Sequence, residues 1–398
     1  MRPLLFLLLG VGILSAETIG QLIDKSLHNH RSLKAIEQRL DASDSAIART
    51  RNFENPTVSL TINDIQFDDI GDRTLEPMQW TAIKAKQKFP WFGKRDARGK
   101  YERAKKTLVF RSLEAAQVRL AEEIRKTVYT IKEIDGRLAI LAKYRKVTQE
   151  NIDLNTAYTA TQRDRHSGIV SAELTLSAIK IRIEKLQSIR ESQRAKLEYL
   201  VQGKIGSVKA SLKIHPPRSL GSYLRSVERN REYHIKLAKR EIAEADSAVK
   251  SLEEYADPYV ELGYFERQEH PDFGSISIGI SAPIYGTERL DSEAARMQAL
   301  SARSEAIDYR LKLRSEIKGI YAQLKESWRI YKIIKEESLP NIEHMFDLNS
   351  ASIQSGGDLF TTIDILRQKL TLDEQLVAAK ANYLRTEAKL KSLTGVIK

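Results

Sequence analysis

The sequence contains no cysteine among its 398 residues. Disulfide bonds, thiolate metal sites and a lipid-bearing N-terminal cysteine are therefore excluded. Long apolar runs are also missing, apart from one near the N-terminus, and charged residues make up 30% of the chain. Because a membrane-spanning helix needs about 20 predominantly apolar residues, this is not the sequence of a polytopic helical membrane protein.

The chain also lacks the patterns that carry catalysis or bind a metal ion. Its seven histidines are scattered, and His28 and His30 lie two positions apart on a predicted helix, where their side chains diverge. No glycine-rich phosphate loop and no cluster of carboxylates accompanies them. We therefore expect no enzyme activity, no metal site and no cofactor.

The net charge of +12 raises the possibility of a nucleic-acid-binding protein. The lysines and arginines, however, are spread along predicted helices and alternate with aspartate and glutamate, as on solvated helix faces. We expect no nucleic-acid partner.

The one apolar run predicts export. Met1-Arg2 precedes the run from Leu4 to Leu14, and Ser15-Ala16 follows it. A basic start, an apolar stretch of this length and a small-residue exit are typical of a signal peptide. Residues 1–16 are therefore predicted to be removed, with cleavage near Ala16.

What the sequence does contain is one pattern that occurs twice, at an offset of about 190 to 200 residues. A helix leads into a β-hairpin, and a long helix, a reversal and a returning helix follow. The first repeat spans 17–203 with its hairpin at about 56–91, 204–217 form a linker, and the second repeat spans 218–398 with its hairpin at about 258–285. The hairpins open at Asn55-Pro56 and Asp257-Pro258, and close on Pro90-Trp91-Phe92-Gly93 and Pro283-Ile284-Tyr285-Gly286.

The helices are predicted from apolar residues at every third or fourth position. Residues 17–55 and 218–256 each form one helix by this criterion. Gly93 to Gly168 contains no proline and would extend about 110 Å as one helix, with a spacing that favours coiled-coil packing and a local irregularity at Gly136. The second copy runs from Gly286 to Ser355, and Pro340 must kink or interrupt it.

Glycines mark the predicted ends of these helices. Reversals are expected at Ser167-Gly168 in the first repeat and at Ser355-Gly356-Gly357 in the second. The returning helices are expected to end at Gly203 and Gly395.

The strands alternate between an apolar and a polar face. The predicted lipid-facing side chains are Val58, Leu60, Ile62, Val260, Leu262, Ile276, Ile278 and Ile280. The opposite face carries Lys84, Lys86, Lys88 and Glu261, which would line a water-filled lumen. Strands of about ten residues, tilted near 40°, cover a band of about 25 Å, which matches the wall of an outer-membrane barrel. Aromatic residues at the strand ends would form an interfacial girdle: Trp80, Phe89, Trp91, Phe92, Tyr255, Phe273 and Tyr285.

Two other interpretations of the hairpins stay open. Such alternation also marks half-buried strands of soluble proteins, and an exported coiled-coil scaffold could use the hairpins as an oligomerisation platform without a pore. Four strands cannot close a barrel, since about eight is the practical minimum. A membrane protein of this sequence must therefore oligomerise, and three copies give twelve strands.

The segment Gln87-Lys88-Phe89-Pro90-Trp91-Phe92-Gly93-Lys94-Arg95 and the stretch from Gly356 through Thr394-Gly395 resemble the TolC-like outer-membrane efflux protein family. The resemblance covers essentially the whole chain after residue 16. It implies a mainly α protein with four strands per protomer, whose trimer forms a 12-stranded β-barrel on a periplasmic α-helical barrel. It also implies an outer-membrane channel of a tripartite efflux system, with a periplasmic membrane-fusion adaptor and an inner-membrane pump as partners. The Phe-Gly-Lys-Arg form most resembles the branch that exports heavy-metal cations or drugs.

The resemblance also implies site residues at the periplasmic tip. By position, Ser167, Gly168, Ser355, Gly356 and Gly357 would contact the adaptor. Asp364 matches the second of two aspartates that ring the closed entrance in the family. Thr361 occupies the position of the first aspartate, so the ring of charge is reduced here.

Overall fold

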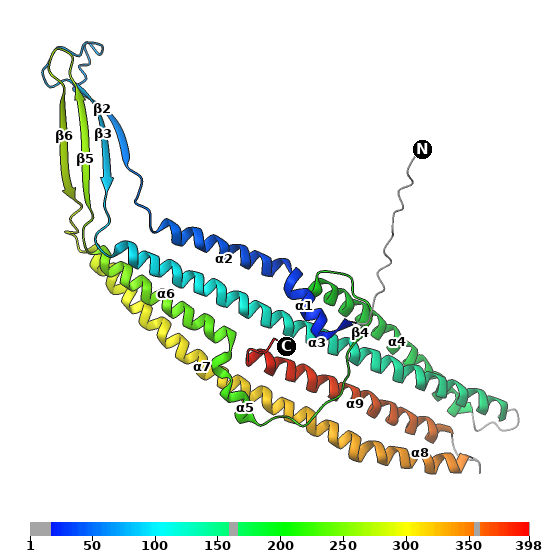
Figure 1. Ribbon diagram of the computed structural model, residues 1–398. Helices are drawn as coiled ribbons and strands as arrows, with labels where there is room; N and C mark the ends of the chain where they lie inside the picture. The colour runs from blue at the N-terminus through cyan, green and yellow to red at the C-terminus, as the bar shows by residue number, and fades with distance from the viewer. Residues whose placement is uncertain (1–16, 159–165, 354–358, 398) are drawn as a thin grey trace, which may run out of the picture. The chain divides into compact units, whose positions relative to one another are not determined.

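The computed structural model describes residues 17–158, 166–353 and 359–397, and its elements follow the predicted repeat (Figure 1). The first repeat contains α1 (Ile19–Asn29), α2 (Arg31–Arg49), β2 (Thr57–Asn63), β3 (Trp80–Lys88), α3 (Lys94–Tyr158) and α4 (His166–Val201). The second contains α5 (Leu220–Arg225), the 3₁₀ turn η3 (Val227–Arg229), α6 (Arg231–Glu253), β5 (Pro258–Glu266), β6 (Phe273–Ile280), α7 (Thr287–Ile333), α8 (Leu339–Ile353) and α9 (Leu359–Leu393). The predicted signal peptide, 1–16, lies outside the described residues.

The hairpins join into one antiparallel sheet in the order β2-β3-β5-β6 (Figure 1). The pairing of β3 with β5 connects the two repeats, and it places Lys86 opposite Glu261. β2 and β6 are the edge strands of this sheet, so the sheet is open within one chain.

The chain divides into two compact units, and both contain segments of both repeats. Ala35–Leu113 and Glu232–Arg310 form one of them, which we call the sheet unit. Met1–Lys34, Glu114–Arg231 and Leu311–Lys398 form the other, which we call the helical unit. The compact units therefore cut across the sequence repeats.

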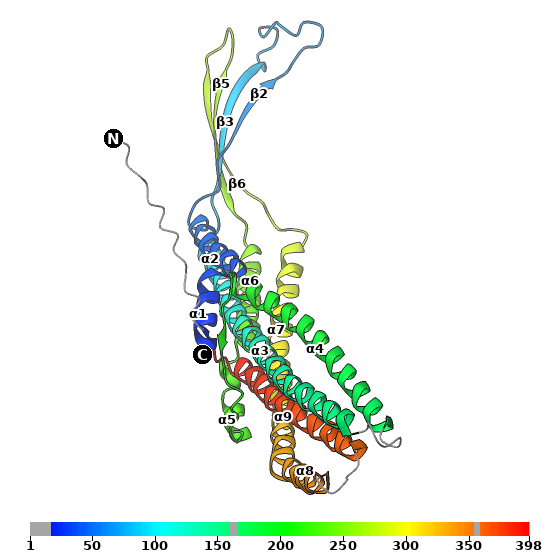
Figure 2. The same cartoon turned by 90° about the vertical axis from the view of Figure 1, so that its right-hand side faces the viewer.

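In the sheet unit, the strands continue from the ends of four helices, as Figure 2 shows. Small side chains dominate the buried positions of these helices, which lets their backbones approach closely. They are Ala97, Ala104, Ala238, Ala295 and Ala306.

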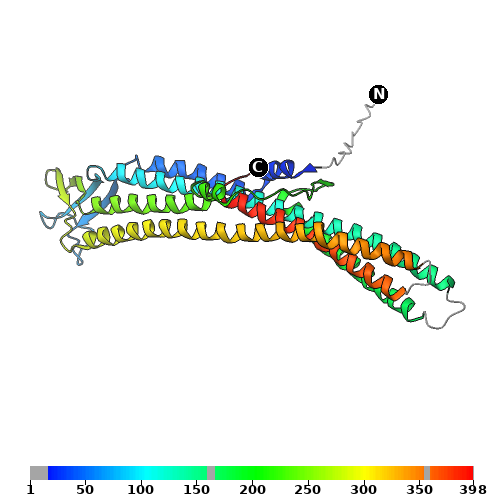
Figure 3. The same ribbon diagram turned by 90° about the horizontal axis from the view of Figure 1, so that it is seen from below.

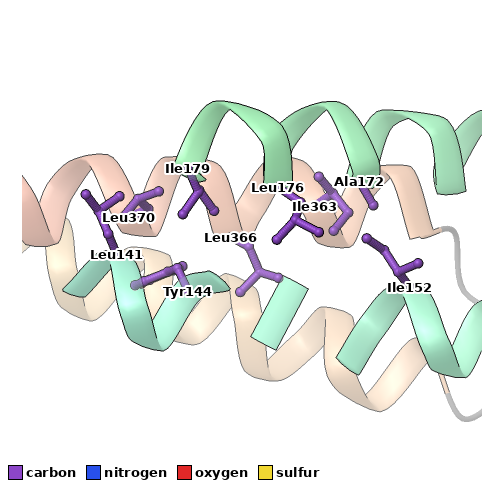
Figure 4. Close-up of a cluster of buried hydrophobic side chains, with 9 residues drawn as sticks. All are labelled: Leu141, Tyr144, Ile152, Ala172, Leu176, Ile179, Ile363, Leu366 and Leu370. Carbon is purple, nitrogen blue, oxygen red and sulfur yellow. The ribbon is translucent and has the colours of Figure 1, made fainter. Parts of the chain in front are cut away.

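In the helical unit, α4 and α8 both pack along α9, and the second part of α3 packs against α4 and α9 (Figure 3). A buried cluster joins three of these helices, with Leu141 of α3, Leu176 of α4 and Leu366 of α9 among its members (Figure 4). Gly136 does not disturb α3, contrary to the predicted irregularity. A Cβ there would lie 3.0 Å from a methyl carbon of Val377 on α9, so the glycine permits a close approach of the two helices.

The first helix of each repeat is broken, contrary to the prediction of single helices over 17–55 and 218–256. His30 adopts an extended conformation between α1 and α2, and Asn230 does the same before α6. Both residues are buried and engage distant parts of the helical unit. The Asn230 side chain donates to the carbonyl oxygen of Leu393 at 2.9 Å, and the His30 ring meets the edge of Tyr199. These contacts favour the break over a continuous helix.

Two further details concern the linker and Pro340. Within the predicted linker, β4 (Val208–Lys209) pairs in parallel with β1 (Glu17–Thr18), a ladder too short to leave a sequence signal.

The interruption predicted at Pro340 is confirmed. A π-helical segment, Ile334–Ser338, separates α7 from α8, because proline lacks the amide hydrogen and its ring collides with the preceding turn.

Candidate functional site

The sheet has one apolar face. The register places the predicted lipid-facing side chains of β2, β5 and β6 on the same side, where Ile83 of β3 joins them, with Ile278 opposite Val260 and Leu60 opposite Ile83. Ile276 and Ile278 are 74% and 77% exposed in the single chain. So wide an exposed aliphatic surface is unusual for a soluble monomer and indicates a surface that meets lipid or protein.

The opposite face carries the basic side chains. Lys84, Lys86 and Lys88 alternate along β3, and Glu261 of β5 lies directly across from Lys86. The ammonium group of Lys86 lies 3.6 Å from the ring centre of Tyr259. A cation at this distance is attracted by the aromatic ring, so the lysine is held over the sheet.

Three aromatic residues gather on this same basic face. Trp80 lies 4.8 Å from Phe265, and Phe265 stacks on Phe273 with ring centres 4.5 Å apart. Trp80 and Phe273 therefore lie on the face opposite the predicted lipid-facing side chains, which does not fit the predicted interfacial girdle. Strand alternation decides their side, because Trp80 lies an even number of residues before Lys84.

A buried ion pair joins the two repeats at the end of the sheet where β3 ends and β5 begins. The Nζ atom of Lys94, the first residue of α3, lies 2.6 Å from the Asp257 carboxylate, and these side chains are 5% and 9% exposed. The same carboxylate accepts the amide hydrogen of Trp91 at 2.8 Å, and Lys88 lies 3.4 Å away. Lys94 also donates to the carbonyl oxygen of Tyr255. We call this group the Lys94–Asp257 clasp.

The environment of Asp257 keeps it ionised. Burial alone would raise its pKa. The hydrogen bonds from Lys94 and the Trp91 amide, with the charges of Lys94 and Lys88, outweigh burial and lower the pKa below its ordinary value. The clasp is therefore a charged pair at neutral pH.

The predicted constriction residues lie on α9. Ile363 and Leu366 are buried in the cluster of Figure 4, whereas Thr361 is exposed and Asp364 is half-buried. Thr361 and Asp364 lie three positions apart and so share one side of the helix. The Asp364 carboxylate accepts a hydrogen bond from Gln368 at 2.8 Å.

Polar contacts tie this part of α9 to its neighbours. The Tyr144 hydroxyl of α3 donates to Asp373 at 2.8 Å, and Arg367 donates to Thr175 of α4 at 2.9 Å. Burial and the hydrogen bond to Asp373 raise the pKa of Tyr144, so it remains a neutral donor. Together these contacts hold α9 against α3 and α4.

The reversal predicted at Ser167-Gly168 is wrong. α4 begins at His166, so both residues are helical and Gly168 is buried. Within the described residues, the glycines with positive φ are Gly93, Gly286 and Gly395. The predicted tip residues Ser355, Gly356 and Gly357 lie outside the described residues.

Two features are absent from the described part of the chain. No group of three or more histidine, aspartate or glutamate side chains there could hold a metal ion. No helix in the same residues combines the length and apolar character needed to cross a membrane.

No protein-family model matches the sequence, and no curated protein matches it significantly. Solved structures do match. The outer membrane protein VceC of Vibrio cholerae superposes with a TM-score of 0.78 at 13% identity, over 95% of this chain and 96% of VceC. The open state of the Neisseria gonorrhoeae outer membrane channel MtrE gives 0.77 at 14% identity, over 95% and 89%. CusC, studied for its folding and transmembrane channel formation, gives 0.73 at 13%, over 96% and 93%.

The chain has the fold of these outer-membrane channels. The resemblance seen in the sequence is thereby confirmed for the fold. The match covers the sheet unit and the helical unit alike, since nearly the whole chain is included.

Proposed function

We propose that this protein is the outer-membrane exit duct of a tripartite efflux system. Three copies would close their four-stranded sheets into a twelve-stranded barrel, with the large helical portion in the periplasm. The observation that carries the proposal is the open, two-faced sheet, whose apolar face suits lipid and whose basic face suits a water-filled lumen. It occurs on a chain with the fold of VceC and MtrE.

The duct would act passively. Nothing in the sequence resembles a nucleotide site, so the energy would come from an inner-membrane pump, with a periplasmic adaptor between the two. The predicted adaptor contact is at the helix reversals. Opening would require the helices at this end to separate, which breaks contacts such as Tyr144–Asp373 and Arg367–Thr175. The Phe92-Gly93-Lys94-Arg95 segment supports heavy-metal cations or drugs as substrates.

The constriction role of Asp364 predicts a change in ion selectivity. Three copies of the carboxylate near the pore axis would attract cations. Asp364→Asn should lower the preference for cations over anions by about twofold or more. This preference is measured from the reversal potential across a planar bilayer in a salt gradient. Asp153→Asn is the matched control, because Asp153 also lies on a helix and accepts a hydrogen bond from a glutamine four residues away. Equal reversal potentials for both variants would place the constriction elsewhere.

Location and stoichiometry test the proposed function itself. The protein should be recovered from the outer-membrane fraction of the cell, and the detergent-solubilised particle should have three times the mass of the chain. Recovery as a soluble periplasmic protein would instead favour a coiled-coil scaffold without a pore.

A further inference from the structure

Each repeat contributes a strand followed by a long helix, and also a helix followed by a strand. Where the first kind of element pair meets the second, they form a joint, and a single chain contains only one complete joint. In the complete joint, β3 pairs with β5, and the start of α3 meets the residue before β5 in the Lys94–Asp257 clasp. The repeat places β6 and α7 in the positions of β3 and α3, and β2 and α2 in those of β5 and α6. Gly93 and Gly286, with φ of 86° and 71°, both lie directly before the long helices and fix this correspondence.

The residues that correspond to the clasp are neutral and uncovered. Lys94 corresponds to Thr287, because each directly follows its glycine, Gly93 or Gly286. Asp257 corresponds to Asn55, because each directly precedes the proline that opens its hairpin. Thr287 and Asn55 are both exposed, whereas Lys94 and Asp257 are buried. A threonine hydroxyl and an asparagine amide are both able to hydrogen-bond, and neither carries a charge.

A second ion pair has its charges exchanged between the two sites. Arg98 of α3 lies 4.0 Å from Glu253 of α6, and it is shared with Glu54. The corresponding residues are Asp291 of α7 and Arg51, which lies two residues beyond the end of α2. Both are exposed in the single chain. In the complete joint the long helix carries the basic residue, Arg98, and its partner is acidic. In the open joint the long helix carries the acidic residue, Asp291, and the corresponding partner is basic.

The apolar residues of α7 show the same contrast. Ala97 and Ala104 of α3 are buried. Leu290 and Met297 occupy the corresponding positions of α7, and they are 60% and 47% exposed. Larger apolar side chains at uncovered positions indicate that another surface covers them.

We propose that a second copy of this chain completes the open joint in the register of β3 with β5, with Asp291 pairing with Arg51 of the next copy and Thr287 on the side of Asn55. The proposal rests on the proposed function, and it names the residues through which the copies meet. The register places Ser277 of β6 opposite Thr61 of the neighbouring β2, and Ile278 opposite Leu60. Aliphatic side chains then meet on one face and small polar ones on the other, as a continuous barrel wall requires.

The proposed joint uses different surfaces of the two copies, so the association runs head to tail and ends only when a ring closes. Charge also selects the correct neighbours. A joint built from two first repeats would bring Arg98 against Arg51, and like charges repel. The exchanged pair therefore favours second-repeat to first-repeat contacts.

Disulfide trapping tests the register, because the chain has no cysteine of its own. The Phe89 amide donates to the Pro258 carbonyl oxygen at 2.8 Å, which makes Lys84–Gly263 one of the non-hydrogen-bonded pairs of that ladder. Ser277–Thr61 is the corresponding pair, so its Cα atoms should lie about 4.5 Å apart, within the range of a disulfide. The shifted pair Ser275–Thr61 has the same face and chemistry but a diagonal separation of about 7–8 Å.

Oxidised cells expressing Thr61→Cys with Ser277→Cys should give covalent dimers and trimers on a non-reducing gel. Thr61→Cys with Ser275→Cys should give at least about tenfold less, because that distance exceeds disulfide geometry. Trapping by the shifted pair instead, in a protein that is still trimeric, would overturn the register and leave the proposed function intact. A protein that is monomeric outside the membrane would contradict the proposed function as well.

A charge exchange tests the ion pair separately. Arg51→Asp and Asp291→Arg should each lower the fraction of trimer that survives heating in detergent, and the double variant should restore it. If the double variant instead loses as much heat-resistant trimer as the two single variants together, the two residues do not meet.

Discussion

Replacing Ile278 with arginine is expected to abolish assembly of the protein in the outer membrane. Ile278 lies on the apolar face of β6, and an arginine on the lipid side of a barrel costs about 2–4 kcal/mol near the bilayer centre. A trimer carries the substitution three times, so the costs accumulate in one particle. The measurement is the amount of heat-resistant trimer in the outer-membrane fraction.

Ser277→Arg is the matched control, because Ser277 precedes Ile278 on the same strand and faces the basic side of the sheet. Its arginine would lie in the aqueous lumen, and assembly should continue. Equal assembly of the two variants would show that the aliphatic face does not meet lipid, and it would favour a soluble oligomerisation platform.

Breaking the Lys94–Asp257 clasp is expected to have the second large effect. Asp257→Asn leaves the Lys94 ammonium buried without its carboxylate, and removing one partner of a buried ion pair typically costs about 3–5 kcal/mol. The clasp joins the repeats where β3 ends and β5 begins, so its loss weakens both hairpins together. Thermal unfolding of the detergent-solubilised protein should show a clearly lower midpoint for the variant.

The pH dependence of this effect follows from the lowered pKa of Asp257. A carboxyl group whose pKa is lower in the folded protein than in the unfolded chain adds stability above its unfolded pKa, and this stability disappears as the pH falls through the folded value. The difference in stability between wild type and Asp257→Asn should therefore have its full size at neutral pH. It should shrink only below the ordinary pKa of 3.8.

Lys88→Met provides the control for the clasp. Lys88 lies 3.4 Å from the same carboxylate, but its side chain is 45% exposed, so its loss should cost less than about 1 kcal/mol. An effect as large as that of Asp257→Asn would mean that general charge around Asp257 stabilises the joint, and not the buried pair.

The repeat, the hairpins and the faces of the strands could be predicted because each depends on local pattern. Alternation places Ile278 and Lys84 on opposite faces whatever the surroundings, and Pro340 interrupts a helix wherever it occurs. The fold itself was indicated by short segments such as Pro90-Trp91-Phe92-Gly93, although no family model matches the sequence.

Some of the incorrect predictions depend on tertiary contacts. The break at His30 has no local signal, because the contacts that favour it come from α4. The start of α4 ahead of Gly168 went unpredicted because glycine usually marks a helix end, yet here it is buried inside one. Trp80 and Phe273 were assigned to a girdle by their place at strand ends, without regard to the alternation that sets their side.

The clasp was missed for a related reason. Lys94 and Asp257 are far apart in sequence, and a lone lysine in a chain with 65 lysines and arginines attracts no notice. Only the pairing of β3 with β5 brings them together. The exchanged charges of Asp291 and Arg51 become meaningful once that joint is known.

The central claim, a passive pore made by this chain alone, is tested most directly by recording single-channel currents from the purified protein. The recording uses a planar bilayer without pump, adaptor or nucleotide. A passive pore should give stable conductance steps whose current varies linearly with voltage and which persist without any energy source. Protein that is folded and helical but produces no steps at any voltage would contradict this claim.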